Sequence, residues 1–113
     1  MATTLRSERT SGIGIVATQI GNYTAPSTTT GVVVSGLSVA NTNLSLPILV
    51  NVYLFDGVTP IYLVKNCPIQ PGSSVNFADQ GNRITLNAND QVFVVSSISA
   101  SADVIMSVME IAN

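Results

Sequence analysis

Apolar and polar residues alternate with a period of two through most of this chain, and clusters of Gly, Pro, Asn and Asp interrupt the pattern roughly every 8–12 residues. In an extended strand this alternation places successive side chains on opposite faces, so that one face can be buried. The connections are too short for the crossovers that parallel strands require. The pattern therefore predicts an all-β fold, an antiparallel β-sandwich or jelly-roll-like barrel of about eight strands.

The stretch PILVNVYLFDG (47–57) shows the alternation most clearly. Val50, Val52 and Leu54 fall on one face of the expected strand, and the intervening residues, including Tyr53 and Phe55, fall on the other. The pair at 56–57, Asp-Gly, is a hairpin signal, since Gly tolerates positive φ. Further strands are expected within 13–20, 31–43, 61–66, 74–78, 83–86, 91–97 and 102–111, with turns at 79–82 and 87–90.

The opening stretch MATTLRSERTSG contains Arg6, Glu8 and Arg9, three of the ten charged residues of the chain. It is polar and has no apolar run of the kind that signal peptides carry. We predict a flexible N-terminal arm at 1–11 that becomes ordered on a partner, followed by a single β-sandwich domain at 12–113. Arg6, Glu8 and Arg9 are the candidate partner-binding residues, because charged side chains form the stronger hydrogen bonds. A solvated, frayed terminus is the alternative.

The scarcity of charge constrains function. Charged residues make up 9% of the 113 residues, against about 25% in ordinary soluble domains. A folded chain of this mass exposes about 5,900 Å², which gives one charge per roughly 600 Å². Extensive uncharged surface favours aggregation unless a partner covers it. We therefore expect a homo-oligomer, or a subunit of a larger assembly. The four basic residues are scattered, which argues against nucleic acid, and no apolar run is long enough to span a membrane.

Catalytic machinery is hard to find in the sequence. There is no His to act as a general base or metal ligand, and Cys67 is the single cysteine. We predict no catalytic residue, no cofactor and no metal site, and we interpret Cys67 as a small apolar filler. Calcium binding at the loops 79–82 or 87–90 stays open, although each loop has one carboxylate. The stretch GIGIVA (12–17) fits a dinucleotide-binding spacing but precedes a β-branched run instead of a helix. The acidic residues expected at turns or strand ends are Asp56, Asp79, Asp90 and Asp103.

Several segments between residues 31 and 111 together resemble the small all-β structural proteins of tailed bacteriophage virions. These segments are GLSVANTN (36–43), VNVYLFDG (50–57), YLVKNCPIQPGSS (62–74), ITLNANDQVFVVSS (84–97) and VIMSVMEI (104–111). The resemblance implies a capsid decoration, or cement, protein on the exterior of the virion. Such a protein stabilises the shell by oligomerising, with a trimer favoured, and by bridging subunits of the major capsid protein.

Three other functions remain open at this point. A neck, tail or fibre protein of the same particle would fit the resemblance equally well. A carbohydrate- or receptor-binding sandwich would need exposed aromatic rings, and the chain has no Trp, three Tyr and three Phe. Most of these aromatic residues fall within expected strands, as core or interface. An enzyme is disfavoured by the small set of acid and base groups.

Overall fold

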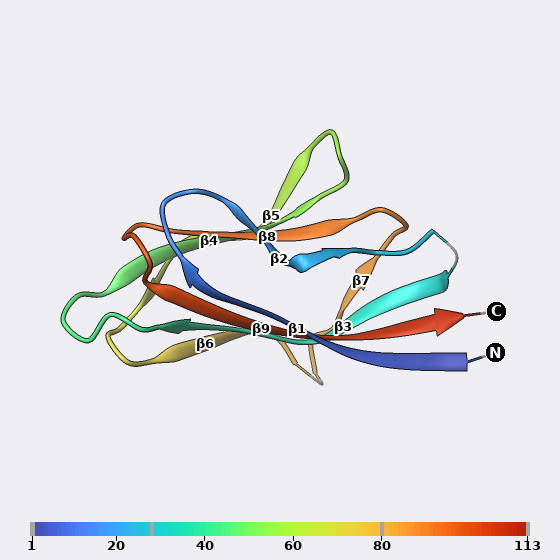
Figure 1. Ribbon diagram of the computed structural model, residues 1–113, viewed down its shortest axis with the longest axis horizontal. Helices are drawn as coiled ribbons and strands as arrows, with labels where there is room; N and C mark the ends of the chain where they lie inside the picture. The colour runs from blue at the N-terminus through green and yellow to red at the C-terminus, as the bar shows by residue number, and fades with distance from the viewer. Residues whose placement is uncertain (1, 28, 80, 113) are drawn as a thin grey trace.

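The computed structural model describes residues 2–27, 29–79 and 81–112, which form two packed antiparallel sheets (Figure 1). Sheet A has the order β1-β9-β3-β6, and β7 also pairs with β3; sheet B has the order β2-β8-β4-β5. The strands of sheet A are β1 (Ala2–Ile13), β3 (Thr29–Asn41), β6 (Ser74–Ala78), β7 (Ile84–Leu86) and β9 (Ala102–Ala112). Those of sheet B are β2 (Thr18–Thr24), β4 (Ile48–Phe55), β5 (Pro60–Ile69) and β8 (Gln91–Ser96).

The predicted all-β sandwich is confirmed. Every strand pair is antiparallel, and the described residues contain nine strands, where about eight were expected, and no helix. No helix in this part of the chain is long and apolar enough to cross a membrane. The turns at 56–57 and 87–90 are also as predicted: Gly57 has a φ of 97°, and the Asn87 amide donates to the Asp90 carboxylate at 2.8 Å.

The core lies between the two sheets and is built from the alternate residues that the period of two singled out. In β4, Val50 and Val52 are fully buried, whereas Tyr53, on the opposite face of the strand, is half-buried. β8 repeats the pattern with Val92 and Val94. Aliphatic side chains dominate this core, which also includes Ile20, Val34, Leu37, Val39, Ile48, Ile69, Leu86, Val104, Met106 and Val108. Burial of these side chains is the main stabilising contribution to the fold.

A buried amide shapes one end of the sandwich. Asn41 is 2% exposed, and its Nδ2 donates to the carbonyls of Leu46 and Ile69 at 2.9 and 3.0 Å. Its Oδ1 accepts the Asn43 amide at 2.9 Å. A buried polar group is tolerated when its hydrogen bonds are made in this way. Asn41 therefore fixes the loop 42–47 that joins the two sheets.

The prediction of a flexible arm is wrong for residues 2–11. These residues belong to β1, which pairs along β9 from Ala2↔Ala112 to Thr10↔Val104 and, after an irregularity, at Ile13↔Ala102. The sequence reading took charge and polarity as signs of disorder. Thr-rich segments favour strands, however, and charged residues are common on edge strands because they discourage pairing with other chains. β1 is such an edge.

The strand expected at 13–20 is also partly wrong. The chain leaves sheet A at Ile13 and enters sheet B at Thr18, so that residues 14–17 form a connection between sheets. Gly14 occupies a tight position, where a Cβ would lie 2.9 Å from the Ala100 amide nitrogen. Ile15 and Val16 are exposed. Their β-branched side chains looked like a buried strand in the sequence, but the change of sheet turns them to solvent.

Candidate interaction surfaces

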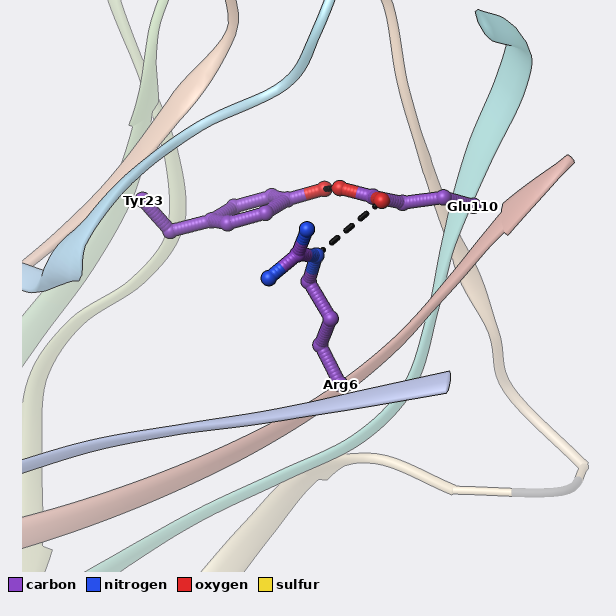
Figure 2. A network of polar contacts seen from close by, with 3 residues as sticks. All are labelled: Arg6, Tyr23 and Glu110. Carbon is purple, nitrogen blue, oxygen red and sulfur yellow. Dashed lines mark hydrogen bonds and ion pairs between the residues drawn. The ribbon is translucent and has the colours of Figure 1, made fainter. Parts of the chain in front are cut away.

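Three ionisable side chains from three strands meet at one end of the sandwich (Figure 2). Glu110 of β9 is 7% exposed and lies between Tyr23 of β2 and Arg6 of β1. The Tyr23 hydroxyl donates to Glu110 Oε2 at 2.5 Å, and Arg6 Nε donates to Oε1 at 3.0 Å. The Arg6–Glu110 pair is also a salt bridge, with the Arg6 side chain half exposed. We call these three residues the Glu110 network.

The network sets the ionisation of its members. Burial alone would raise the pKa of Glu110, but the hydrogen bonds from Tyr23 and Arg6 and the Arg6 charge outweigh it, and the pKa is lowered. The pKa of Tyr23 is raised, first by burial and then by its hydrogen bond to the carboxylate. At neutral pH the site therefore holds a carboxylate, a neutral phenol and a guanidinium. The Glu110 carboxylate is thus paired with the Arg6 guanidinium of the same chain.

The other two residues predicted to bind a partner do not join this network. Glu8 is half-buried, and its side chain covers Gly21, where a Cβ would lie 2.8 Å from the Glu8 Cβ. Arg9 is exposed, with Nε donating to Ser7 Oγ at 3.1 Å. Arg6, Glu8 and Arg9 thus share one strand, but the structure does not gather them into one site. Their role in partner binding stays a prediction.

Four aromatic residues form a cluster on the solvent-facing side of sheet B. The register aligns Phe93 of β8 with Tyr53 of β4, and Tyr53 with Tyr62 of β5, so that one row of rings crosses three strands. Phe55 lies one pleat further along β4 and meets Phe93 edge to face at 5.9 Å. The neighbouring core residues Val52 and Val94 point the other way. We call Tyr53, Phe55, Tyr62 and Phe93 the aromatic surface.

The ring geometry of the aromatic surface decides what it can bind. Tyr53 and Phe93 are stacked at 5.4 Å with an angle of 4° between their planes, so each turns one ring face toward the other. Tyr62 is tilted against Tyr53 at 5.2 Å, and the Lys65 ammonium lies 4.9 Å from the Tyr62 ring centre. Stacking on sugar needs free ring faces. Here the rings contact one another and Lys65, which leaves less ring face free for a sugar.

A second apolar region lies at the end of the sandwich formed by the loops 14–17, 42–47 and 97–101. The Thr42 amide donates to the Ser101 carbonyl, and the Ser101 amide donates to the Ile13 carbonyl, which holds the loops together. Leu44 is 84% exposed. Two of these loops each carry two exposed aliphatic side chains, namely Ile15 and Val16 in 14–17 and Leu44 and Leu46 in 42–47. We call these four residues the apolar end.

The described residues offer little for catalysis or metal binding. No group of three or more His, Cys, Asp or Glu side chains within residues 2–27, 29–79 and 81–112 is placed to hold a metal ion. In the loops considered for calcium, the carboxylates of Asp79 and Asp90 already accept backbone amides. A cleft of about 210 Å³ lies beside Leu54, Asp56, Thr59, Ile61, Thr85, Asn87 and Asp90. It is smaller than the roughly 300–1,000 Å³ of typical ligand pockets.

The fold is shared with proteins of two large assemblies. No protein-family model matches the chain, and no curated protein matches it in sequence. Among solved structures, the chain is similar to one from Bacillus endospore appendages, described as disulfide-linked pili, with a TM-score of 0.55, 15% identity, and coverage of 100% of this chain and 93% of that one. It is also similar to part of a chain from infectious bursal disease virus (Gx strain), with a TM-score of 0.54, 12% identity, and coverage of 95% of this chain and 32% of that one. At these identities the likeness shows the fold.

Proposed function

We propose that this protein is a non-enzymatic structural subunit that associates with copies of itself in a larger assembly. The observation that carries the proposal is the aromatic surface: four rings stand on the solvent side of sheet B in a chain with ten charged residues. Tyr62 is 44% exposed and the other three rings are half-buried. Apolar patches that reach the solvent mark interaction sites, and aromatic residues are enriched in interfaces. The rings come from central and edge strands of one sheet, so they form a rigid surface.

For the kind of assembly, we propose a virion, with a bacterial appendage as the alternative. The resemblance of residues 31–111 to phage virion proteins supports a capsid decoration protein on the virion exterior, bound to the major capsid protein. The similarity in fold to a pilus chain supports an appendage instead. With one cysteine in these 113 residues, disulfides can join copies only in pairs. An extended assembly of this chain would therefore rest on noncovalent contacts.

The carbohydrate-binding alternative is less well supported by the ring geometry. Tyr53 and Phe93 turn faces toward each other, and Lys65 covers a face of Tyr62. A sugar ring would have to displace these contacts before it could stack. The parts of these rings that remain exposed can pack against aliphatic or aromatic side chains of a second copy while the contacts among the rings are kept. Self-association is the interpretation that requires no change in the surface.

Light scattering on the purified chain tests the proposal. We expect a native mass that is a multiple of 11.8 kDa, with three chains as the specific expectation for a decoration protein. Tyr62→Lys should lower that mass, because a second ammonium beside Lys65 would have to be buried in the interface. Thr85→Lys is the matched control, since Thr85 is exposed on β7 of sheet A, outside the aromatic surface and outside the pairing of β1 with β9. A wild-type chain that stays at 11.8 kDa at high concentration would contradict the proposal.

A further inference from the structure

We propose that residues 2–11 of β1 exchange between copies of this chain, so that the segment pairs with β9 of a neighbouring copy in place of its own. The inference rests on the self-association proposed above and specifies one contact through which it occurs. β1 is an edge strand, and residues 3–11 pair with β9 without burying a side chain in the core.

The side chains of β1 contribute little to the core. None of the side chains of residues 3–11 is buried; Glu8 and Thr10 are half-buried and Leu5 is 75% exposed. From residue 3 onward, the first buried side chain of the strand is that of Ile13. The hydrophobic contribution of residues 3–11 to the fold is accordingly small. This segment is held mainly by its backbone pairing with β9 and by a few polar contacts.

A hinge is already present where this segment meets the rest of the domain. The pairing of β1 with β9 is irregular between Thr10 and Ile13, and Gly12 has a φ of 67° in that gap. The Gly12 amide donates to Asp103 Oδ1 at 3.0 Å and the Ile13 carbonyl accepts the Ser101 amide at 2.9 Å, so the chain is held to the domain from the Gly12 amide onward. Large changes in φ and ψ at a few residues suffice to redirect a segment. Ser11 and Gly12 are in the right place to do so.

The contacts that this segment makes with the rest of the domain are to β2 and β9, so a second copy offers the same partners. The Gly21 amide of β2 donates to Thr10 Oγ1 at 2.7 Å, Glu8 covers Gly21, and Arg6 pairs with Glu110. An exchanged segment would recover all of these contacts together with the pairing to β9. Exchange of identical elements is a low-cost route to oligomers for this reason.

Charge makes the acceptor site selective for this segment. Glu110 is buried and is hydrogen-bonded to both Tyr23 and Arg6, so a domain that releases its own β1 loses the cation beside a buried carboxyl group. Arg6 of another copy, in the same register opposite Val108, supplies it. The segment spans about 33 Å at the usual rise of a strand, which is most of the 47 Å length of the molecule. Exposed Ile15 and Val16 follow the hinge within a few residues of the chain, where a neighbouring copy can cover them.

A disulfide across the strand pair tests the exchange. Ser7 lies opposite Ser107 in the register, and directly opposite residues meet the separation that a disulfide needs. We suggest Ser7→Cys with Ser107→Cys in a Cys67→Ala chain, oxidised and run on a denaturing gel without reductant. Asn51→Cys with Val95→Cys in the same background is the matched control, because these residues are likewise directly opposite but belong to β4 and β8, which are not proposed to exchange. Light scattering before oxidation records the native mass.

Exchange predicts covalent dimers or longer ladders from the 7–107 pair, while the 51–95 pair gives single chains of 11.8 kDa with no free thiol. Single chains from both pairs, in a sample whose native mass is oligomeric, would overturn the exchange and leave self-association intact. Two free thiols at 7 and 107, with closure at 51 and 95, would also overturn it. A monomeric native mass would overturn both the exchange and the proposed function.

Discussion

The hydroxyl of Tyr23 donates to the carboxylate of Glu110 at 2.5 Å, and the two residues belong to strands of different sheets. Most of the contact between the sheets is aliphatic, so this hydrogen bond is a directional link across the core. Arg6 of β1 completes the carboxylate's partners (Figure 2). The Glu110 network thus joins both sheets to the edge strand at one place.

Tyr23→Phe should lower the free energy of unfolding by about 1–3 kcal/mol, because it removes a hydrogen bond to a buried charged group and leaves that carboxylate oxygen unpaired. Denaturant unfolding measures the change. Tyr62→Phe is the control, since the exposed Tyr62 hydroxyl lies outside the network and its loss should change stability by less than about 0.5 kcal/mol. Equal effects from the two variants would argue against the network as a stabilising link.

The free energy of unfolding should decrease at acidic pH because Glu110 becomes protonated. Its folded-state pKa lies below the ordinary value of 4.5, so the folded state favours the carboxylate more strongly than the unfolded state does. The resulting stabilisation is present above the unfolded pKa and is lost as the pH falls through the folded pKa. We expect the stability advantage of the wild type over Glu110→Gln to shrink as the pH falls from neutrality to about 3. A difference independent of pH over this range would contradict the assignment.

Leu37→Ala should destabilise the protein by about 2–5 kcal/mol, because Leu37 is fully buried between the sheets and truncation leaves a cavity. Leu44→Ala makes the same chemical change at a residue of the apolar end that is exposed to solvent. It should alter the stability of the isolated chain by less than about 0.5 kcal/mol. Urea unfolding of both variants gives the comparison, and a similar cost for the two would contradict the burial of Leu37 between the sheets.

Gly14→Ala should destabilise the connection between β1 and β2 by about 1–3 kcal/mol, since the added methyl would meet the backbone of Ser99 and Ala100 at 2.9–3.0 Å. Gly31→Ala serves as the control because a Cβ there meets nothing within 4 Å. Thermal unfolding of the two variants should differ clearly. If Gly14→Ala melts with the wild type, the close approach of the two loops is not maintained in solution.

Residue alternation predicted the sheets of this protein well and their connections less well. Val50 and Val52 on one face of β4, with Tyr53 on the other, follow directly from a period of two. The same reasoning failed at Ile15 and Val16, because a change of sheet is set by the packing of Gly14 against another loop, which local sequence does not reveal.

The candidate surfaces depend on long-range register, which periodicity does not specify. Tyr23 and Glu110 are 87 residues apart, and the aromatic surface exists only because Phe93, Tyr53 and Tyr62 are aligned across three strands. The sequence placed these rings within strands, but it did not indicate whether they lie in the core or in an interface. Arg6 was predicted to bind a partner protein, and that role stays a prediction; within the fold it pairs with Glu110 of the last strand, which the sequence did not indicate.

Ala2 pairs with Ala112, and the labels N and C lie together at one extremity of the ribbon (Figure 1). The loop 42–47, which joins β3 to β4 and carries Leu44 and Leu46, lies at the opposite extremity of the long axis (Figure 1). A fluorescent protein or surface anchor fused near either terminus would therefore point away from this loop. Copies tethered in this way would all display the same loops outward, which makes the molecule a directional building block whatever its neighbours are.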